Sequence, residues 1–485
     1  MGGLSRKAYM IKQIQSEGDK PVLLLDGGAL LFDQPLIPPS LLPARMIQAR
    51  GISQAMQAMK YGAIGVAAQD LAGGLEFLLR QGREHGLTHL SANLVDRAGK
   101  KPFKPSITTR VGETPVAVIG LTGEPAGKKP GMASEEYRLL PWQETLPETI
   151  KQARGAEMII LLSSYPEPVN REIAGRFPGI HLIIQSGTFS ANKAPLLVGN
   201  TLLTQVAAKG KYMGRLDIDW NASRRWGQVQ NGTPQLQQAK DNLDRIKWRL
   251  GRLEKRSPDK EGLAQNSEYQ QLRQEQERLT AEIARLDQPA QEDKQEELAT
   301  FTSNFIPLKT SLPEDPEVQK IVQQTKQEVN RSGQKKSGEA AAGKTLQDRG
   351  MTGWRACQAC HPEQAAFWQK TGHAGAWQTL VRERQQANQD CVLCHVTLPA
   401  YDLQTVHQEN LLASLTEDFQ GVGCEACHGP GGRHVASPGQ VLPLTPTEKT
   451  CLTCHTPDHD SDFSYERKLP LIRCPASAPK SKGAA

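Results

Sequence analysis

The chain has 485 residues, of which 38% are hydrophobic, and its formal net charge is +6. This length exceeds what one typical core supports, so we expect two or three domains. No apolar run reaches the roughly 20 residues of a membrane-spanning helix, and the basic opening residues lack the apolar core of a secretion signal. The small positive excess does not favour nucleic-acid binding.

The first part of the chain alternates apolar runs with amphipathic segments. Two of the amphipathic segments, at residues 52–60 and 74–86, have the spacing of helices. The apolar runs predict buried strands at residues 21–28, 62–68, 88–95, 114–123, 157–164 and 180–187. Together with a β-rich stretch over 194–220, this alternation predicts a layered α/β domain covering residues 1–230.

The composition then changes to Gln, Glu, Arg and Lys around a sparse apolar stripe. The stripe has three-four spacing at Leu236, Ala239, Leu243, Ile246, Leu250 and Leu253, and again at Tyr269, Leu272, Gln276, Leu279, Ile283 and Leu286. This pattern predicts an antiparallel coiled-coil hairpin over 234–288. A spacer or assembly arm is the simplest interpretation, and oligomer formation or partner binding is the alternative.

The remaining chain divides into three segments. Residues 289–349 are predicted to be a linker with one helix near 316–330. Residues 350–475 hold all nine cysteines, and residues 476–485 have the composition of a disordered tail. We expect the cysteine-rich segment to be mostly helical or irregular.

A five-residue motif, C-x-x-C-H, occurs four times in this segment. Two thiols at this spacing can bond to the vinyl groups of one haem, and the adjacent His then becomes the proximal iron ligand. Zinc and disulfides need no His after every second Cys. The sequence therefore predicts four covalent haem c groups, with thioether positions Cys357, Cys360, Cys391, Cys394, Cys424, Cys427, Cys451 and Cys454 and proximal ligands His361, His395, His428 and His455.

A six-coordinate haem iron also needs a distal ligand. Met351 is the only nearby methionine, and it precedes the first motif, whereas four further histidines lie in the segment: His373, His407, His434 and His459. Equal numbers of haems and spare histidines favour bis-His coordination, which suits electron transfer. For each of them an exposed or hydrogen-bonded role is the alternative. The ninth cysteine, Cys474, is open to four interpretations: a distal thiolate, a free thiol, an intermolecular disulfide or a residue without a role.

Three stretches of this segment resemble a known family. They are WQKTGHA at 368–374, GVGCEACHGPGGRH at 421–434 and the final CLTCHTPDHDSDFSYE. Over residues 350–475 the chain is similar to the tetrahaem cytochrome c family typified by the electron acceptor of hydroxylamine oxidoreductase in ammonia oxidisers. The resemblance implies electron transfer through closely packed haems. One haem of that typical member lacks a sixth ligand, so four bis-His haems are not implied.

Residues 2–220 resemble the metallophosphatase domain of the 5′-nucleotidase family, which implies a four-layered α-β-β-α sandwich. Active members hold two metals with Asp, Asn and His residues. Those positions correspond here to Ala29, Ala68, Gln69, Ser164 and the loop at 185–189, and the surviving Asp26 matches a position that does not bridge the metals. We therefore expect no phosphatase activity. His85, His89 and His181 are isolated and fit structural or surface roles.

These expectations combine into an extracytoplasmic multihaem electron carrier with a catalytically dead phosphatase-like domain as a scaffold or docking module. Its partners would be other cytochromes or oxidoreductases, with no nucleic acid, and its export signal would be missing from this version of the chain. One alternative is a haem reductase of a small nitrogen or sulfur oxyanion at an open distal face. Another is a binding or assembly module.

Overall fold

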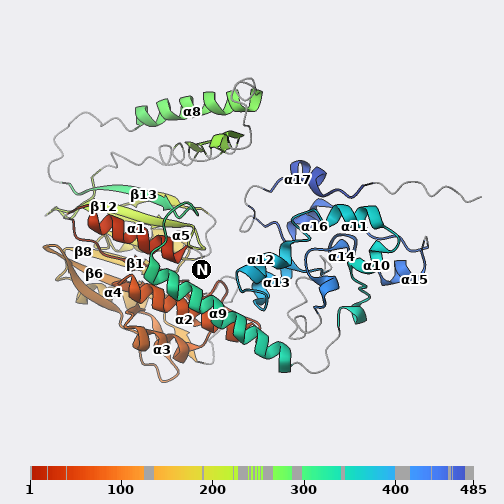
Figure 1. Ribbon diagram of the computed structural model, residues 1–485. Coiled ribbons are helices and arrows are strands. Elements are labelled where there is room, and N and C mark those ends of the chain that lie inside the picture. The colour runs from red at the N-terminus through yellow and green to blue at the C-terminus, as the bar shows by residue number, and fades with distance from the viewer. Residues whose placement is uncertain are drawn as a thin grey trace, which may run out of the picture. The chain divides into compact units, whose positions relative to one another are not determined.

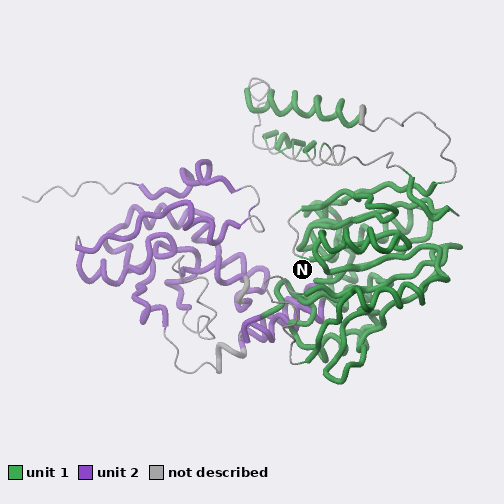
Figure 2. The backbone as a smooth tube through the Cα atoms, turned by 180° about the vertical axis from the view of Figure 1, so that it is seen from behind, with its two compact units in different colours: residues 1–36, 52–320 green, residues 37–51, 321–485 purple. Residues whose placement is uncertain are grey.

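The computed structural model describes residues 3–18, 20–39, 41–124, 136–187, 191–221, 223–227, 266–286, 298–339, 345–398, 415–438, 440–456, 460 and 463–475, with scattered residues between 239 and 254. The chain divides into two compact units, shown in Figure 2. Unit 1 comprises residues 1–36 and 52–320, and unit 2 comprises residues 37–51 and 321–485. Each unit is described by itself below.

Unit 1 is built on a six-stranded mixed sheet (Figure 1). Its inner strands pair in parallel, and the central strands are mostly apolar, because a sheet covered on both faces leaves no solvent side for polar residues. The edge strands β5 and β10 pair antiparallel to their neighbours. In spatial order the strands are β10 (Lys193–Val198), β11 (Thr201–Gln205), β9 (Leu182–Gln185), β8 (Met158–Ser163), β6 (Thr114–Leu121) and β5 (Ser106–Val111).

Different layers cover the two faces of this sheet. One face packs on helices α4 (Trp142–Gln152) and α5 (Glu167–Arg176) through Trp142, Leu146 and Ile173. The other face packs on Ala63 and Leu90 of a second sheet, and on Trp226 and Phe301. These contacts give one helical layer and two strand layers. The fourth layer of the predicted sandwich stays a prediction.

Smaller sheets and helices complete unit 1. A parallel three-stranded sheet contains β1 (Leu25–Asp26), β2 (Ala63–Gly65) and β3 (His89–Leu90), while β4 (Leu94–Asp96) pairs with β7 (Tyr137–Leu139). The remaining helices are α1 (Leu4–Ser16), α2 (Leu42–Ala58), which continues into unit 2, the short 3-10 helix η1 (Ala68–Leu71) and α3 (Leu75–His85).

The strands of the structure are generally shorter than the predicted ones, and two of them differ in further ways. Only Leu25 and Asp26 pair within the predicted strand at 21–28, and Val22 is 41% exposed. The predicted strand at 88–95 divides into β3 and β4. Between them the side chain of Asn93 donates to the Thr122 carbonyl oxygen at 2.8 Å and accepts from the Thr122 N–H at 2.9 Å. These two hydrogen bonds from the Asn93 side chain stand where the main chain of a continuous strand would pair.

The linker predicted at 289–349 contains a strand that the sequence pattern does not reveal. Strand β13 (Thr300–Pro307) pairs antiparallel with β12 (Tyr212–Asp219) over all eight residues. The predicted helix of this segment is α9 (Pro316–Glu339), which is longer than the 316–330 pattern. Its Asn330 side chain accepts from the Ala387 N–H at 2.7 Å within unit 2.

The predicted coiled-coil segment is described only in part. Helix α8 (Ser267–Leu286) buries Leu272 and Leu279. Two polar contacts join it to the preceding arm: Arg249 pairs with Glu268 at 2.8 Å, and the Tyr269 hydroxyl donates to Glu254 at 3.0 Å. Leu236 lies outside the described residues, and coiled-coil packing of the two arms stays a prediction.

Unit 2 consists of short helices around a small core of Leu346, Met351, Leu380, Val392, Val396, Leu398 and Phe419. No helix among the described residues is both long and apolar enough to cross a membrane. Besides parts of α2 and α9, the helices described in unit 2 are η2 (Gln347–Arg349), α10 (Trp354–Gln358), α11 (Pro362–Trp368), α12 (Ala376–Arg382), α13 (Gln389–His395), η5 (Glu417–Phe419), α14 (Cys424–His428), α15 (Gly432–Ala436), α16 (Glu448–Leu452) and α17 (Tyr465–Ile472).

Candidate haem-binding site

Each C-x-x-C-H motif lies on or beside a short helix of unit 2. The second and third motifs lie within α13 and α14, and the first and fourth begin in α10 and α16. In the first motif the His361 N–H donates to the Cys357 carbonyl oxygen at 2.9 Å, and His455 does the same to Cys451 at 2.9 Å. This helical turn places the first Cys and the His on one face. None of the nine cysteines is in a disulfide within the chain.

Thiols from different motifs lie next to each other. Cys357 hydrogen-bonds to Cys424, which raises the pKa of Cys357 and lowers that of Cys424. Cys394 and Cys454 form the same kind of pair, with the pKa of Cys394 raised and that of Cys454 lowered. The first motif therefore adjoins the third, and the second adjoins the fourth.

Two pairs of imidazoles face each other within unit 2. The ring centroids of His361 and His434 are 6.1 Å apart with an interplanar angle of 24°. Those of His373 and His455 are also 6.1 Å apart, at 51°. Each pair joins a predicted proximal ligand to a predicted distal ligand. His407 and His459 lie outside the described residues.

The separation of these rings fits a shared metal ion. A metal–imidazole bond is about 2 Å long, so two imidazoles on opposite sides of one metal have centroids about 6 Å apart. A ligating imidazole must also be neutral. Burial lowers the pKa of His373, and the neighbouring His455 lowers it further. The residues present thus fit a haem iron held between two histidines.

The hydrogen bond made by one ring nitrogen of a histidine determines which nitrogen is free to bind a metal. When Nδ1 carries the proton and donates it to an acceptor, Nε2 keeps its lone pair for the metal. Four of the described histidines have such an acceptor at Nδ1: the carbonyl oxygens of Ala376 for His395 (2.8 Å), Leu444 for His428 (2.9 Å) and Val441 for His434 (2.7 Å), and the Asp460 carboxylate for His455 (2.8 Å).

The main chain around His373 is held by its neighbours. Its carbonyl oxygen accepts from the Val422 N–H at 2.9 Å, and the Trp368 indole donates to the Val422 carbonyl oxygen at 2.8 Å. Gly421 has φ +82°, and a Cβ there would lie 2.7 Å from the Ala374 carbonyl oxygen. Only glycine fits both demands, so the glycine of the GVG stretch allows this loop to approach His373.

Glu425 is a site-organising residue that the motif pattern does not predict, because the x positions of C-x-x-C-H have no required chemistry. Its side chain is buried, and its carboxylate accepts from the N–H groups of Thr352 (2.9 Å), Gly353 (2.8 Å) and Gly431 (2.7 Å). Gly353 precedes α10, and Gly431 precedes α15 with His434. Glu425 therefore ties together the two segments that bring His361 and His434 face to face.

Cys474 lies after α17 in unit 2. It lines an open cavity of about 610 Å³ together with Tyr465, Leu469 and Arg473. Burial raises the pKa of the Cys474 thiol. Cys474 in turn raises the pKa of Cys427, after the larger effects of burial and of Cys451. The last cysteine is therefore near the third motif, and its role stays open.

In unit 1 the predicted phosphatase positions hold polar contacts between protein groups. Asp70 is buried and accepts from the N–H groups of Ala29 (2.8 Å), Leu30 (2.8 Å), Leu31 (2.9 Å) and Ala67 (2.9 Å). The Ser164 hydroxyl accepts from the Gly123 N–H at 2.8 Å. Within the described part of the chain, no three His, Cys, Asp or Glu residues are grouped to hold a metal ion.

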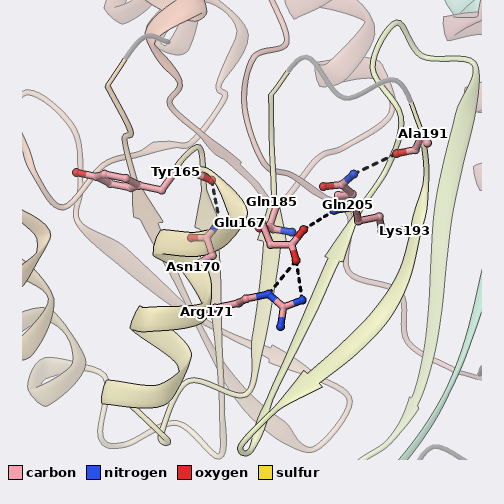
Figure 3. Close-up of polar contacts among 8 residues, drawn as sticks. All are labelled: Tyr165, Glu167, Asn170, Arg171, Gln185, Ala191, Lys193 and Gln205. Carbon is pink, nitrogen blue, oxygen red and sulfur yellow. Dashed lines mark hydrogen bonds and ion pairs between the residues drawn. The ribbon is translucent and has the colours of Figure 1, made fainter. Parts of the chain in front are cut away.

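Figure 3 shows a polar cluster near the carboxyl ends of β8 and β9. The Asn170 amide donates to the Gln185 side chain at 2.9 Å and to the Tyr165 carbonyl oxygen at 2.8 Å. Glu167 forms ion pairs with Arg171 and Lys193, which together lower its pKa. Asn170 and Gln185 thus form one hydrogen-bonded group, and Glu167, Arg171 and Lys193 form another, near the edge where Gln185 begins the predicted 185–189 loop.

Comparisons with known proteins give different relatives for the two parts of the chain. Solved structures similar to it include the sulfate thiohydrolase SoxB of Thermus thermophilus, with 17% identity, a TM-score of 0.43 and coverage of 67% of this chain and 46% of that one. They also include the calcineurin-like phosphoesterase YfkN of Bacillus subtilis, with 16% identity, a TM-score of 0.42 and coverage of 67% of this chain and 89% of that one.

The cysteine-rich segment matches a family model described as cytochrome c554 and c-prime, over residues 356–429. Cytochrome c-554 of Nitrosomonas europaea is 33% identical over an alignment of 99 residues, which covers 17% of this chain and 40% of that protein. The chain thus spans less than half of this curated relative. The chain therefore carries, at residues 356–429, a segment similar to the cytochrome c554 and c-prime family.

Proposed function

We propose that this protein is a multihaem c-type cytochrome that passes electrons through four covalently bound haems. The observation that carries the proposal is the pair of facing imidazoles, His361 with His434 and His373 with His455, each with ring centroids 6.1 Å apart. The family match over residues 356–429 supports the same reading. A zinc or disulfide domain would need neither these pairs nor a His directly after the second Cys of every motif.

The geometry favours a specific assignment of distal ligands. His434 would complete the haem attached at Cys357 and Cys360, because it faces His361. His373 would complete the haem attached at Cys451 and Cys454, because it faces His455. His407 and His459 remain the proposed distal candidates for the other two haems.

The bound haems would supply the reversible one-electron chemistry of iron. The chain itself would hold neutral imidazoles in place through Nδ1 and set the distance between haems. The thiol contacts Cys357–Cys424 and Cys394–Cys454 favour short steps between the first and third haems and between the second and fourth. This role needs no protein acid or base. The partners would be other cytochromes or oxidoreductases.

The cellular location and the role of unit 1 follow from the same proposal. Because c-type haem is attached outside the cytoplasm, the protein would work in the periplasm or another extracytoplasmic space. Unit 1 would serve as a scaffold or docking module without phosphatase activity, since Ala29, Ala68 and Gln69 offer no metal ligand of the kind that family uses. Added Mn²⁺ should therefore neither raise the unfolding temperature nor release phosphate from 5′-nucleotides. Either effect would contradict this part of the proposal.

The central test is to produce the full chain in a host that attaches c-type haem. We expect an intact mass with four haems, and a C357S/C360S variant should carry one haem fewer. Oxidised and reduced absorption spectra should show low-spin haem. If the host loads a control cytochrome and leaves this chain without haem, the proposal is wrong.

Carbon monoxide then tests the ligand assignment. His434→Ala would leave the iron beside His361 with one protein ligand, so it should bind carbon monoxide on one haem more than the unaltered protein does. The matched control is H85Q, which alters a histidine of unit 1. A carbon monoxide adduct already present in the unaltered protein would reveal an open iron and favour the reductase alternative. An unchanged spectrum in H434A would disprove the assignment.

A further inference from the structure

The acceptor at Nδ1 divides the described haem-ligand candidates into two kinds. His395, His428 and His434 each lie against a main-chain carbonyl oxygen. His455 instead lies 2.8 Å from the Asp460 carboxylate. Among the described histidines of unit 2, it is the one whose second contact is a charged group. A carbonyl and a carboxylate differ by a full charge, so these imidazoles are not electronically equivalent.

The position of Asp460 is set by its own backbone. Its N–H donates to the Thr456 carbonyl oxygen at 2.8 Å, and its carbonyl oxygen accepts from the Phe463 N–H at 3.1 Å. Phe463 stacks on His455, with centroids 4.7 Å apart and an interplanar angle of 23°. These contacts bring both a carboxylate and an aromatic ring to one imidazole.

Lys468 of α17 contacts the same carboxylate oxygen as His455. Its Nζ also lies 5.5 Å from the centroid of Phe463. The Asp460 carboxylate therefore lies between an imidazole and an ammonium group. A carboxylate is an anion at neutral pH, and the Lys468 cation offsets part of this charge.

A carboxylate that accepts the Nδ1 proton of a metal-bound imidazole makes that imidazole a stronger donor. A stronger donor and a nearby negative charge both favour the ferric over the ferrous state. We propose that Asp460 is a positioning residue that lowers the reduction potential of the haem attached at Cys451 and Cys454, acting through His455, and that Lys468 limits this effect. The inference rests on the proposed haem attachment. It would distinguish this haem from those whose proximal histidines donate to main-chain carbonyls.

The test uses the full, haem-loaded chain and a spectroelectrochemical titration. A C451S/C454S variant identifies the potential step that belongs to this haem. Asp460→Asn keeps a carbonyl oxygen as acceptor and removes the charge, so that step should move to a more positive potential. Lys468→Met keeps an apolar stem over Phe463 and removes the opposing charge, so the same step should move to a more negative potential. The low-spin ferric EPR signal of this haem should change in both variants.

The matched control is Glu466→Gln, which removes an exposed carboxylate from the same helix. It should shift the step less than Asp460→Asn does. The intact mass distinguishes a failure of the proposed function from a failure of the role given to Asp460. Fewer than four haems on the unaltered chain contradicts the proposed function. Four haems with unshifted potentials, or an equal shift in E466Q, overturns the role of Asp460 alone. If D460N loses this haem, the Lys468→Met variant tests the inference instead. The inference is wrong if the reduction potential of this haem does not become more negative in Lys468→Met.

Discussion

In each unit, a single buried carboxylate accepts hydrogen bonds from main-chain N–H groups of neighbouring loops. Glu425 accepts three main-chain N–H groups in unit 2, and Asp70 accepts four in unit 1. A buried N–H without a partner costs about 1–3 kcal/mol, so such a carboxylate stabilises each segment that it joins. In unit 2 the joined segments carry haem-ligand candidates, and stability and ligation are therefore linked.

Glu425→Gln should weaken unit 2 and loosen His434 together. The amide keeps one acceptor oxygen and turns an N–H₂ group toward main-chain donors, so we expect a loss of about 2 kcal/mol. In the haem-loaded chain, carbon monoxide should bind one haem more readily than in the unaltered protein. E363Q, which alters an exposed carboxylate on α11, is the control. A destabilised variant with unchanged carbon monoxide binding would show that Glu425 does not position His434.

His181 makes unit 1 sensitive to acid. Burial, with a smaller effect of Arg224, lowers its pKa from 6.5 to about 4, and its Nδ1 accepts from the Ile159 N–H at 3.0 Å. Protonation would place two N–H groups against each other. Because the folded pKa is lowered, the stabilisation is complete above pH 6.5 and is lost as the pH falls from 6.5 toward 4.

The loss should reach about 1.4 kcal/mol for each pH unit within that window. Amide hydrogen exchange in β8 and β9, corrected for its intrinsic pH dependence, measures it. His181→Gln removes the titrating group, so the variant should have a flatter pH profile whatever its absolute stability. His89, whose pKa burial also lowers to about 4, leaves part of the slope in place. Equal slopes in both proteins would contradict the prediction.

At the scale of elements, residues 225–227 and residue 299 lie side by side in unit 1 although 71 residues separate Gly227 from Ala299 in the sequence. The Gly227 N–H donates to the Ala299 carbonyl oxygen at 2.9 Å, and the Ala299 N–H donates to the Arg225 carbonyl oxygen at 2.8 Å. The segment 228–297 is therefore an insertion between adjacent chain ends, and β13 follows it immediately. A short turn can span such ends.

Replacing residues 228–297 with a four-residue glycine-rich turn should leave unit 1 folded, with hydrogen exchange in β12 and β13 unchanged. The contrasting variant is Phe301→Ala: Phe301 is 8% exposed and packs edge-on against Trp226 at 5.5 Å, so its loss should cost about 3 kcal/mol. If the chain that lacks residues 228–297 fails to fold while F301A does fold, residues 228–297 are needed for the folding of unit 1. Light scattering of the excised chain also tests whether the segment supports assembly.

The sequence predicts some elements well because their signal is local. β6 and β8 are continuous apolar runs buried in the central sheet, and the C-x-x-C-H motifs state their chemistry within five residues. β13 mixes polar and apolar residues and follows a Gln- and Glu-rich stretch, so its pairing with β12 is not visible from composition. The facing of His361 and His434, and the contact of Asp460 with His455, depend on tertiary packing that spacing does not encode.

At the scale of the whole molecule, the two units differ in how they are held together. Unit 1 has two clusters of buried side chains on opposite faces of one sheet. The described cluster of unit 2 around Val392 and Phe419 is smaller than either of these. A small core supplies little net stability, and bound groups that occupy only the folded state add to it. The proposed haems would add buried apolar surface to unit 2.

Removing the haems should therefore unfold one unit and spare the other. A chain made without haem attachment should lose residues 345–475 to limited proteolysis, while a fragment containing residues 3–227 resists. Mass spectrometry of the fragments shows which residues the protease has removed. In the haem-loaded chain, digested in parallel, both units should resist proteolysis. A protease-resistant unit 2 without haem would mean that its protein core suffices. In that case the spacing of His361 and His434 would be set by the chain before any haem is attached.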